Sequence, residues 1–286
     1  MSSTNVLYDV PGPRARRRHQ ALGLLTLAVV LAGVGVVVQR LLATDQFSSA
    51  RMAQFQYASV QRELLDGYLA TLRAAAIAAV LALLLGALLA SGRLSAHRVL
   101  RAPSTAMVEF FRGVPLLILM FFFYYGSLEY GLGLSPMWAV VLGLALYNGS
   151  VLAEILRAGV KAVPAGQAEA AYALGLSSSQ VMRQVLLPQA VRSMLPSIIS
   201  QLVVLLKDTA LGFILTYNEL LYVAKQIGGR GNFDYPYVVT YLIVAAIYIA
   251  TCIVLSQVAG WLERRTRRSP QAAQVRVPQD AGAPAT

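Results

Sequence analysis

Long apolar runs, separated by short polar segments, dominate this sequence. A helix needs about 20 predominantly apolar residues to cross the hydrocarbon layer of a membrane. The runs of roughly that length cover residues 21–38, 68–91, 106–128, 137–156, 191–217 and 237–261. Their arrangement predicts an all-α fold, a polytopic membrane helix bundle with about six transmembrane helices.

The apolar pattern divides the chain into four parts. We expect a polar N-terminal tail at 1–20, an added first transmembrane helix with an outer segment at 21–63, the main transmembrane domain at 64–265, and a disordered tail at 266–286. A cleaved signal peptide is the alternative for the first run. Gln39 and Arg40 follow that run, however, where cleavage requires small residues. We therefore favour an uncleaved first span.

Composition and charge agree with a membrane location. Hydrophobic residues make up 57% of the chain and charged residues only 13%, against roughly 25% charged in soluble domains. In a soluble protein the net charge of +11 would suggest a nucleic-acid partner. Here most Lys and Arg residues lie at the two ends and in alternate loops, as expected for cytoplasmic segments. The pattern argues against a nucleic-acid partner and favours membrane lipid as the partner. It also predicts that both termini are cytoplasmic.

Few residues suggest catalysis or a metal site. The single cysteine, Cys252, lies in an apolar run, and His19 and His97 have no partner at metal-ligand spacing. The sequence holds no Gly-x-x-x-x-Gly-Lys-Ser/Thr phosphate loop and no Ser/His/Asp or Cys/His arrangement. We expect no metal, no cofactor and no catalytic residue, so any ATP-driven work must depend on a partner chain.

The polar segment 161–188, between the fourth and fifth runs, has internal order. Good helix formers precede Gly175, which ends a helix in the left-handed conformation. Ser177 with Gln180 forms a capping box that starts a second helix, and Pro188 is expected to end it. The segment is predicted to fold as two short helices with a sharp turn, a shape that suits binding by another protein.

The same segment carries a spaced motif that resembles the EAA loop of ABC importer permeases. The matching positions are Glu169, Ala170, Ala171, Gly175, Val185, Leu187 and Pro188, with Val185 where Ile is usual. In that family the loop is the coupling helix, which docks in a groove of a separate ATPase subunit. The resemblance therefore implies an ATPase-coupling role between spans four and five. An amphipathic surface helix is the alternative.

Motifs in the third run resemble the polar amino-acid uptake subfamily of these permeases. Glu109, Arg112 and Gly113 fit its E-x-x-R-G-T-P-L-L pattern, with Val114 where Thr is usual. The carboxylate and the guanidinium are three residues apart and can face each other on a helix. We favour a structural ion pair between Glu109 and Arg112 over substrate contact by Arg112.

The fourth run resembles the same subfamily, whose pattern there is roughly N-S-x-A-Y-x-A-E-x-x-R-G. Asn148 and Glu154 are the polar residues of interest, followed by Arg157. Asn148 is equally consistent with a contact between helices and with a position along the pathway. For Glu154 we favour a structural pair with Arg157.

Adjacent opposite charges occur deep in the fifth run, where Lys207, Asp208 and Thr209 match the subfamily pattern L-L-K-D-T-S-L. Neighbouring side chains point about 100° apart on a helix, so the two charges cannot pair along a regular helix. Either the helix breaks there or each charge has a partner on another helix. We expect Lys207 and Asp208 at a gate or at a structural clamp around the pathway.

The resemblance implies a permease subunit in the plasma membrane of a bacterium. Its expected partners are ABC ATPase subunits, a second permease chain (a copy or a paralogue), an extracytoplasmic solute-binding protein and an amino-acid substrate. The stretch 6–13 resembles that of glutamate-type permeases, so glutamate or aspartate is the first choice, and glutamine or a basic amino acid the next. An ion-coupled secondary transporter, with Glu109, Glu154 and Asp208 as coupling sites, is the alternative, and a structural membrane protein a third.

Overall fold

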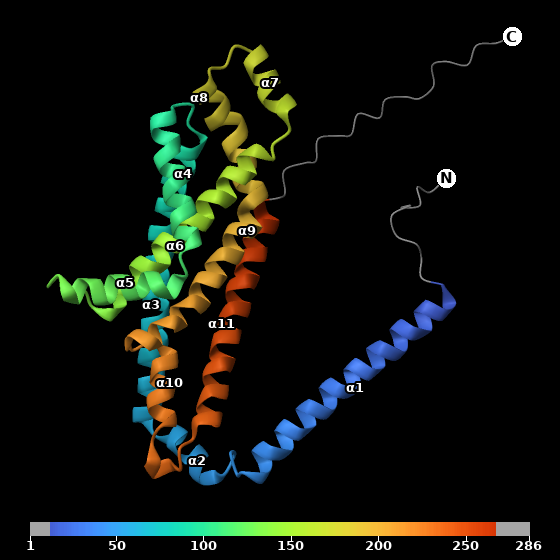
Figure 1. Ribbon diagram of the computed structural model, residues 1–286, viewed down its shortest axis with the longest axis vertical. Helices are drawn as coiled ribbons and strands as arrows, with labels where there is room; N and C mark the ends of the chain where they lie inside the picture. The colour runs from blue at the N-terminus through green and yellow to red at the C-terminus, as the bar shows by residue number, and fades with distance from the viewer. Residues whose placement is uncertain (1–11, 267–286) are drawn as a thin grey trace.

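The structure is a computed structural model that describes residues 12–266, and helices form nearly all of that range (Figure 1). The longer helices are α1 (Pro13–Ala43), α3 (Ala58–Leu94), α4 (Arg98–Gly113), α5 (Leu116–Glu129), α6 (Pro136–Lys161), α9 (Leu187–Asp208) and α11 (Tyr237–Thr266). The shorter ones are α2 (Ser49–Ala53), α7 (Ala165–Ala173), α8 (Ser178–Gln180) and α10 (Leu220–Gly228). The described range contains no β-strand, which confirms the all-α fold.

Five helical stretches are long and apolar enough to cross a membrane, and the bent pair α4–α5 makes six if it counts as one span. The expected bundle of about six transmembrane helices is thereby confirmed. The stretch 6–13, apart from Gly12 and Pro13, and the tail 266–286, apart from Thr266, lie outside the described residues.

The third predicted span, residues 106–128, is not one straight helix. It consists of the end of α4 and most of α5, which meet at a bend of 98°. Val114 has an extended backbone with ψ 129°, and Pro115 follows as the cap of α5. Because proline disfavours the helical conformation of the preceding residue, the chain turns here, and α5 lies across the long axis of the bundle in Figure 1.

The prediction that a helix ends at Pro188 is wrong. A π-helical turn over Val181–Leu186 leads directly into α9, and Pro188 lies in the first turn of α9. The wider turn lets the helix continue because it shifts the carbonyl that the proline ring would otherwise strike. The second helix of the segment 161–188 is therefore continuous with the fifth span.

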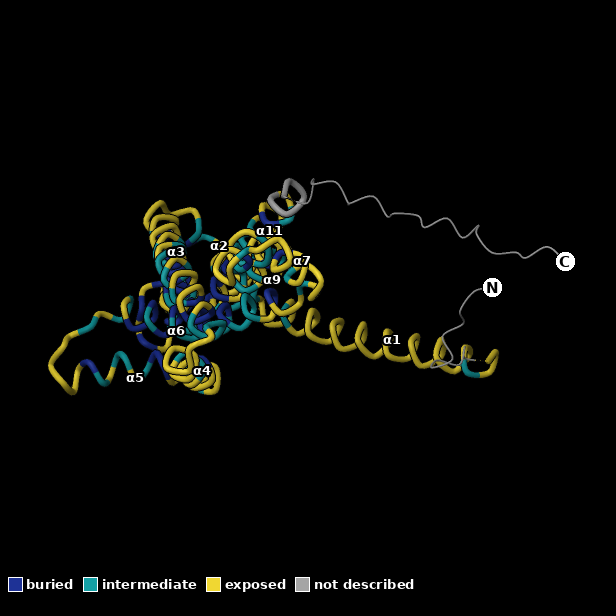
Figure 2. Tube along the Cα trace, turned by 90° about the horizontal axis from the view of Figure 1, so that it is seen from above, coloured by how far each residue is buried: buried dark blue, intermediate teal, exposed yellow. Residues whose placement is uncertain are grey.

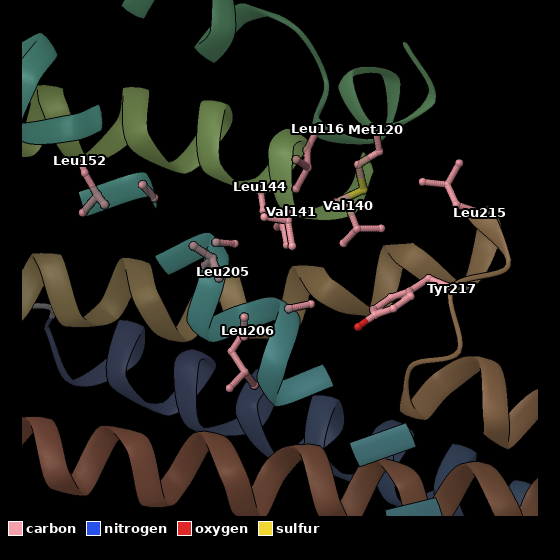
Figure 3. Close-up of a cluster of buried hydrophobic side chains, with 14 residues drawn as sticks. Leu116, Met120, Val140, Val141, Leu144, Leu152, Leu205, Leu206, Leu215 and Tyr217 are labelled. Atoms are coloured by element: carbon pink, nitrogen blue, oxygen red, sulfur yellow. The ribbon is translucent and has the colours of Figure 1, made fainter. Parts of the chain in front are cut away.

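The core lies where α3, α5, α6 and α9 meet (Figure 3). Alanines on α3 are buried against α6, and Gly86 permits an especially close approach. A Cβ at Gly86 would lie 2.9 Å from the Cβ of Leu152. Small residues let membrane helices approach until their backbones nearly touch, and dispersion contacts then hold them together. This packing fixes α6, which leads directly to α7.

Helix α1 stands apart from this core. None of its residues is buried (Figure 2), and it leaves the bundle from the end that carries α2 and α10 (Figure 1). Its apolar surface suits lipid, in keeping with an added first span. Residues 218–236, the Gly-rich connection between the fifth and sixth predicted spans, contain the helix α10, so the connection is partly helical.

Candidate functional site

The turn after α7 has the geometry that its sequence predicts. Gly175 has a φ of +79°, and its N–H donates to the carbonyl of Tyr172 at 2.9 Å. The N–H of Leu176 donates to the carbonyl of Ala171 at 3.2 Å. These two bonds form a Schellman motif, which satisfies the last carbonyls of the helix. Ser177 and Gln180 then form the expected capping box. The turn is thus held by its own backbone and caps.

The surface of this segment is open. Glu169, Ala170, Gly175, Leu187 and Pro188 are exposed, and only Ala171 of the coupling positions is buried. Tyr172 is 50% exposed and Leu174 83% exposed, which is unusual for apolar side chains outside the lipid. A Cβ on Gly175 would meet nothing within 4 Å, so the backbone conformation, rather than space within this chain, requires glycine. In Figure 1, α7 lies at the end of the bundle opposite α10.

One carboxylate joins three arginines near the end of the bundle that carries α7. Glu154 of α6 pairs with Arg157 one turn later, as expected, and also with Arg93 of α3 at 2.7 Å. Arg112, at the end of α4, lies 3.9 Å from the same carboxylate. The expected pair between Glu109 and Arg112 is absent among the described residues, because Arg112 points instead to α6. Glu154 therefore links α3, α4 and α6 beside the α4–α5 bend.

Asn148 holds two helices together. It is fully buried in α6, and its Oδ1 accepts a hydrogen bond from Gln201 Nε2 of α9 at 2.7 Å. Its Nδ2 donates to the carbonyl of Leu144 at 2.9 Å. Both ends of the amide are used, so in this conformation the side chain acts as a contact between helices.

Lys207 and Asp208 mark a change in helix type. Helix α9 ends at Asp208, and a 3-10 turn follows from Thr209 to Leu215. Both charges lie in the last turn of α9, and the helix changes type directly after them, so the regular helix ends at this pair, one of the two expected arrangements. Lys207 lines a cavity of about 670 Å³ between α9 and α11, together with Tyr248 and Gln257. Of the candidate pathway residues, Arg112 and Glu154 lie together, whereas neither they nor Asn148 line this cavity.

Sequence reasoning missed a buried carboxylate at the far end of the bundle. Glu219 is 0% exposed and caps α10, accepting from the N–H groups of Leu221 at 2.9 Å and Tyr222 at 2.7 Å. The Tyr248 hydroxyl of α11 donates to it at 2.8 Å. The apolar helical pattern that follows Glu219 was the available signal, but the nearby glycines suggested a loop.

Comparison with known proteins gives a consistent assignment. Residues 82–268 match the family described as "Binding-protein-dependent transport system inner membrane component". Over 207 residues the chain is 42% identical to the glutamate transport system permease protein GluD of Corynebacterium glutamicum, covering 71% of this chain and 75% of that one. It is 33% identical to the glutamate/aspartate import permease protein GltK of Escherichia coli O157:H7, covering 75% and 100%.

A solved structure agrees in fold. The crystal structure of an amino acid ABC transporter with histidines contains a chain that superimposes with a TM-score of 0.68 at 29% sequence identity. The superposition covers 75% of this chain and 97% of the other. The helices that hold the exposed turn, the arginine cluster and Glu219 are therefore arranged as in a transporter subunit of known architecture.

Proposed function

The chain belongs to the family of binding-protein-dependent transport system inner membrane components, and from this premise we propose that it is the permease subunit of an ATP-driven amino-acid importer. Polar amino acids are the proposed substrate class, with glutamate or aspartate as the first choice. Glutamine and basic amino acids come next, since a relative from Bacillus subtilis is named as a probable glutamine permease.

The exposed segment around α7 is the observation that carries this proposal. Glu169, Ala170 and Gly175 lie on an open surface beside Tyr172 and Leu174. Exposed apolar side chains beside a rigid turn are typical of a docking surface. We propose that this surface fits a groove of a separate ATPase subunit, with Leu187 and Pro188 completing the contact where the chain enters α9.

The charged cluster around Glu154 connects the proposed docking surface to the membrane-spanning helices. Only a short linker separates α7 from α6, and Glu154 ties α6 to Arg93 of α3 and, more loosely, to Arg112 of α4. In the proposed cycle, ATP binding brings two ATPase subunits together and moves the α7 segments with them. The cluster passes that displacement to the α4–α5 bend. ATP shifts the population because it binds one global state better than the other.

The proposed assembly has two permease chains, which are copies or paralogues, and two ATPases. An extracytoplasmic binding protein delivers substrate at the α10 end. Residues 64–265 form the permease domain, and 21–63 add a first span and an outer segment. Both termini are proposed to lie in the cytoplasm of a bacterial cell, on the side of α7. Asn148, Lys207 and Asp208 are proposed to lie along or beside the pathway.

Uptake in membrane vesicles tests the proposal. Right-side-out vesicles from the native organism would be loaded with ATP, treated with ionophores that remove ion gradients, and given labelled glutamate. We expect uptake that requires ATP and is lost when this chain is deleted. Competition by aspartate, glutamine and arginine then ranks the substrates. Uptake that follows an ion gradient without ATP would contradict the proposal and favour a secondary transporter.

A further inference from the structure

The segment between the added first helix and the bundle makes unexpected contacts with a distant part of the chain. Residues 44–57, which we term the outer strap, connect α1 to α3 and lie before the residues that match the family. Residues 230–235, which we term the outer loop, connect α10 to α11. Figure 1 shows α2, in the outer strap, close to the α10 end of the bundle.

One arginine makes most of the polar contact between these segments. Arg51 Nε donates to the backbone carbonyl of Asp234 at 2.9 Å, and Arg51 Nη2 pairs with Asp234 Oδ2 at 2.7 Å. Its Nη1 donates to the backbone carbonyl of Thr44 at 3.0 Å. The planar guanidinium thus spans three acceptors in a fixed geometry, which a lysine cannot do. The Arg51 side chain is only 13% exposed, so the contacts are partly shielded from water.

Further contacts fix the outer loop on both sides. The rings of Tyr57 in the outer strap and Phe233 in the outer loop have centroids 5.8 Å apart. Arg230, at the start of the outer loop, pairs with Glu63 of α3 at 2.5 Å. Gln54 of the outer strap is fully buried, so this segment is packed into the protein and does not merely lie on it.

The outer loop has a backbone that needs such support. Asp234 has a φ of 54° and Tyr235 a φ of 50°, and neither is a glycine. Aspartate tolerates the left-handed region, but for a bulky residue such as tyrosine it is unfavourable. Conformations of this kind persist only where surrounding contacts determine them. Arg51 meets this loop at the first of the two residues, through both its carbonyl and its side chain.

We propose that the outer strap holds the outer loop in one conformation, with Arg51 as the positioning residue, so that the solute-binding protein meets a fixed surface. The proposal rests on the importer function for the identity of that partner, whereas the holding of the loop does not depend on it. The added N-terminal part of the chain thereby acquires a role: α1 anchors the outer strap in the membrane, and the outer strap shapes the face where substrate arrives.

Distances between spin labels test the first half of the proposal on the full chain in lipid nanodiscs. Cys252 is the single cysteine, so Cys252→Ser gives a background for labels at Ser49→Cys and Asn232→Cys, both exposed. We expect a narrow distance distribution with Arg51 present and a broad one in Arg51→Gln. Loss of a network of this kind shifts the balance between held and released loop by about fivefold. Arg62→Gln, an exposed arginine of α3, should leave the distribution narrow.

A second variant keeps the test decisive if Arg51→Gln fails to fold. Asp234→Asn removes the ion pair and leaves the backbone carbonyl that Arg51 also contacts, so it should give a distribution that is broader than that of wild type but still has a main peak at the wild-type distance. A distribution as narrow as that of wild type in every variant that folds would overturn the proposal that the outer strap holds the outer loop.

The second half concerns docking and is read from kinetics. The probe is the extracytoplasmic protein that co-purifies with the wild-type transporter, added at increasing concentration to proteoliposomes. Arg51→Gln should raise the concentration that gives half-maximal uptake by about fivefold, with the maximal rate retained. A changed maximal rate at an unchanged half-maximal concentration would overturn the docking role. If no ATP-driven uptake occurs even in wild type, the importer proposal fails. The spin-label result still decides whether the outer strap holds the outer loop.

Discussion

Glu169 and Glu219 are the same residue type at opposite ends of the bundle, and their surroundings differ completely. Glu169 is exposed on α7, and its side chain forms no hydrogen bond or ion pair within residues 12–266. Glu219 is fully buried and accepts from two backbone N–H groups and the Tyr248 hydroxyl. A carboxylate whose partners all lie in its own chain stabilises the fold. One that is held rigidly without partners is available to another chain.

The two regions also secure their shape differently. The turn at Gly175 is fixed by local bonds of its own backbone, so the surface of α7 is left free. At the other end, polar groups from three helices satisfy one another, as when the N–H of Leu220 donates to Thr71 Oγ1 at 3.1 Å. Substitutions should therefore separate coupling from stability: those in the α7 segment affect transport, and those around Glu219 affect folding.

The largest effect on transport is expected from Gly175→Asp. An aspartate at this positive φ strains the turn by about 1 kcal/mol and adds a charge to the docking surface. The protein should still fold and enter the membrane, while ATP-driven uptake falls to background. Gly175→Asn is the matched variant, because asparagine tolerates the left-handed conformation without a charge, and it should retain part of the uptake. Normal uptake by Gly175→Asp would count against the coupling role.

The largest effect on stability is expected from Glu219→Ala. Loss of the helix cap and of the acceptor for the buried Tyr248 hydroxyl should lower the unfolding free energy by about 3 kcal/mol. Thermal unfolding in detergent measures the change. Glu169→Ala is the control, and it should change the unfolding free energy by less than about 0.5 kcal/mol. Similar losses in the two variants would remove the distinction between the two regions.

A smaller loss of stability is expected from Glu154→Gln. It leaves the closely paired Arg93 and Arg157 without a carboxylate, and because the site is partly exposed the cost should be about 2 kcal/mol. Arg112→Gln should cost less than about 0.5 kcal/mol, since Arg112 is 44% exposed and 3.9 Å away. If Arg112→Gln were as destabilising as Glu154→Gln, Arg112 would contribute to the cluster as strongly as the closely paired arginines, which would contradict this account.

The smallest effect is expected from Lys207→Ala. The lysine lines an open cavity and is exposed, so its loss should leave the melting temperature unchanged. If its charge attracts an anionic amino acid, uptake of glutamate should fall by about tenfold or less, and Lys207→Arg should restore it. Uptake at the wild-type rate in Lys207→Ala would identify the lysine as a charge that only extends to the membrane surface.

Local features were predictable from the sequence, and features that depend on distant contacts were not. The turn at Gly175 and the capping box at Ser177 follow from residues within a few positions, because their bonds close within one helical turn. The pair of Glu154 with Arg157 was predictable for the same reason. The pairing of Glu154 with Arg93 was not predictable, because it requires α3 and α6 to pack side by side, which no local pattern specifies.

Proline alone did not predict whether a helix ends or continues, because the outcome depends on the backbone around it. Pro115 and Pro188 have the same local chemistry, yet the chain bends by 98° beside the first and continues through the second. A π-helical turn precedes Pro188 and makes room for its ring, whereas α4 ends at Gly113 before Pro115 is reached. Likewise, the sequence does not show that Glu219 is buried, because its hydrogen bond from Tyr248 depends on the packing of α11 against it.

Purification of the tagged chain from its native membrane, beside a Gly175→Asp form, tests the central claim that the α7 segment docks on a separate ATPase. Mass spectrometry would identify the proteins that accompany each form. An ATPase with a phosphate-binding loop should accompany the wild-type chain and be strongly depleted from the Gly175→Asp form. A wild-type chain that purifies without any ATPase and still moves substrate on an ion gradient would contradict the claim.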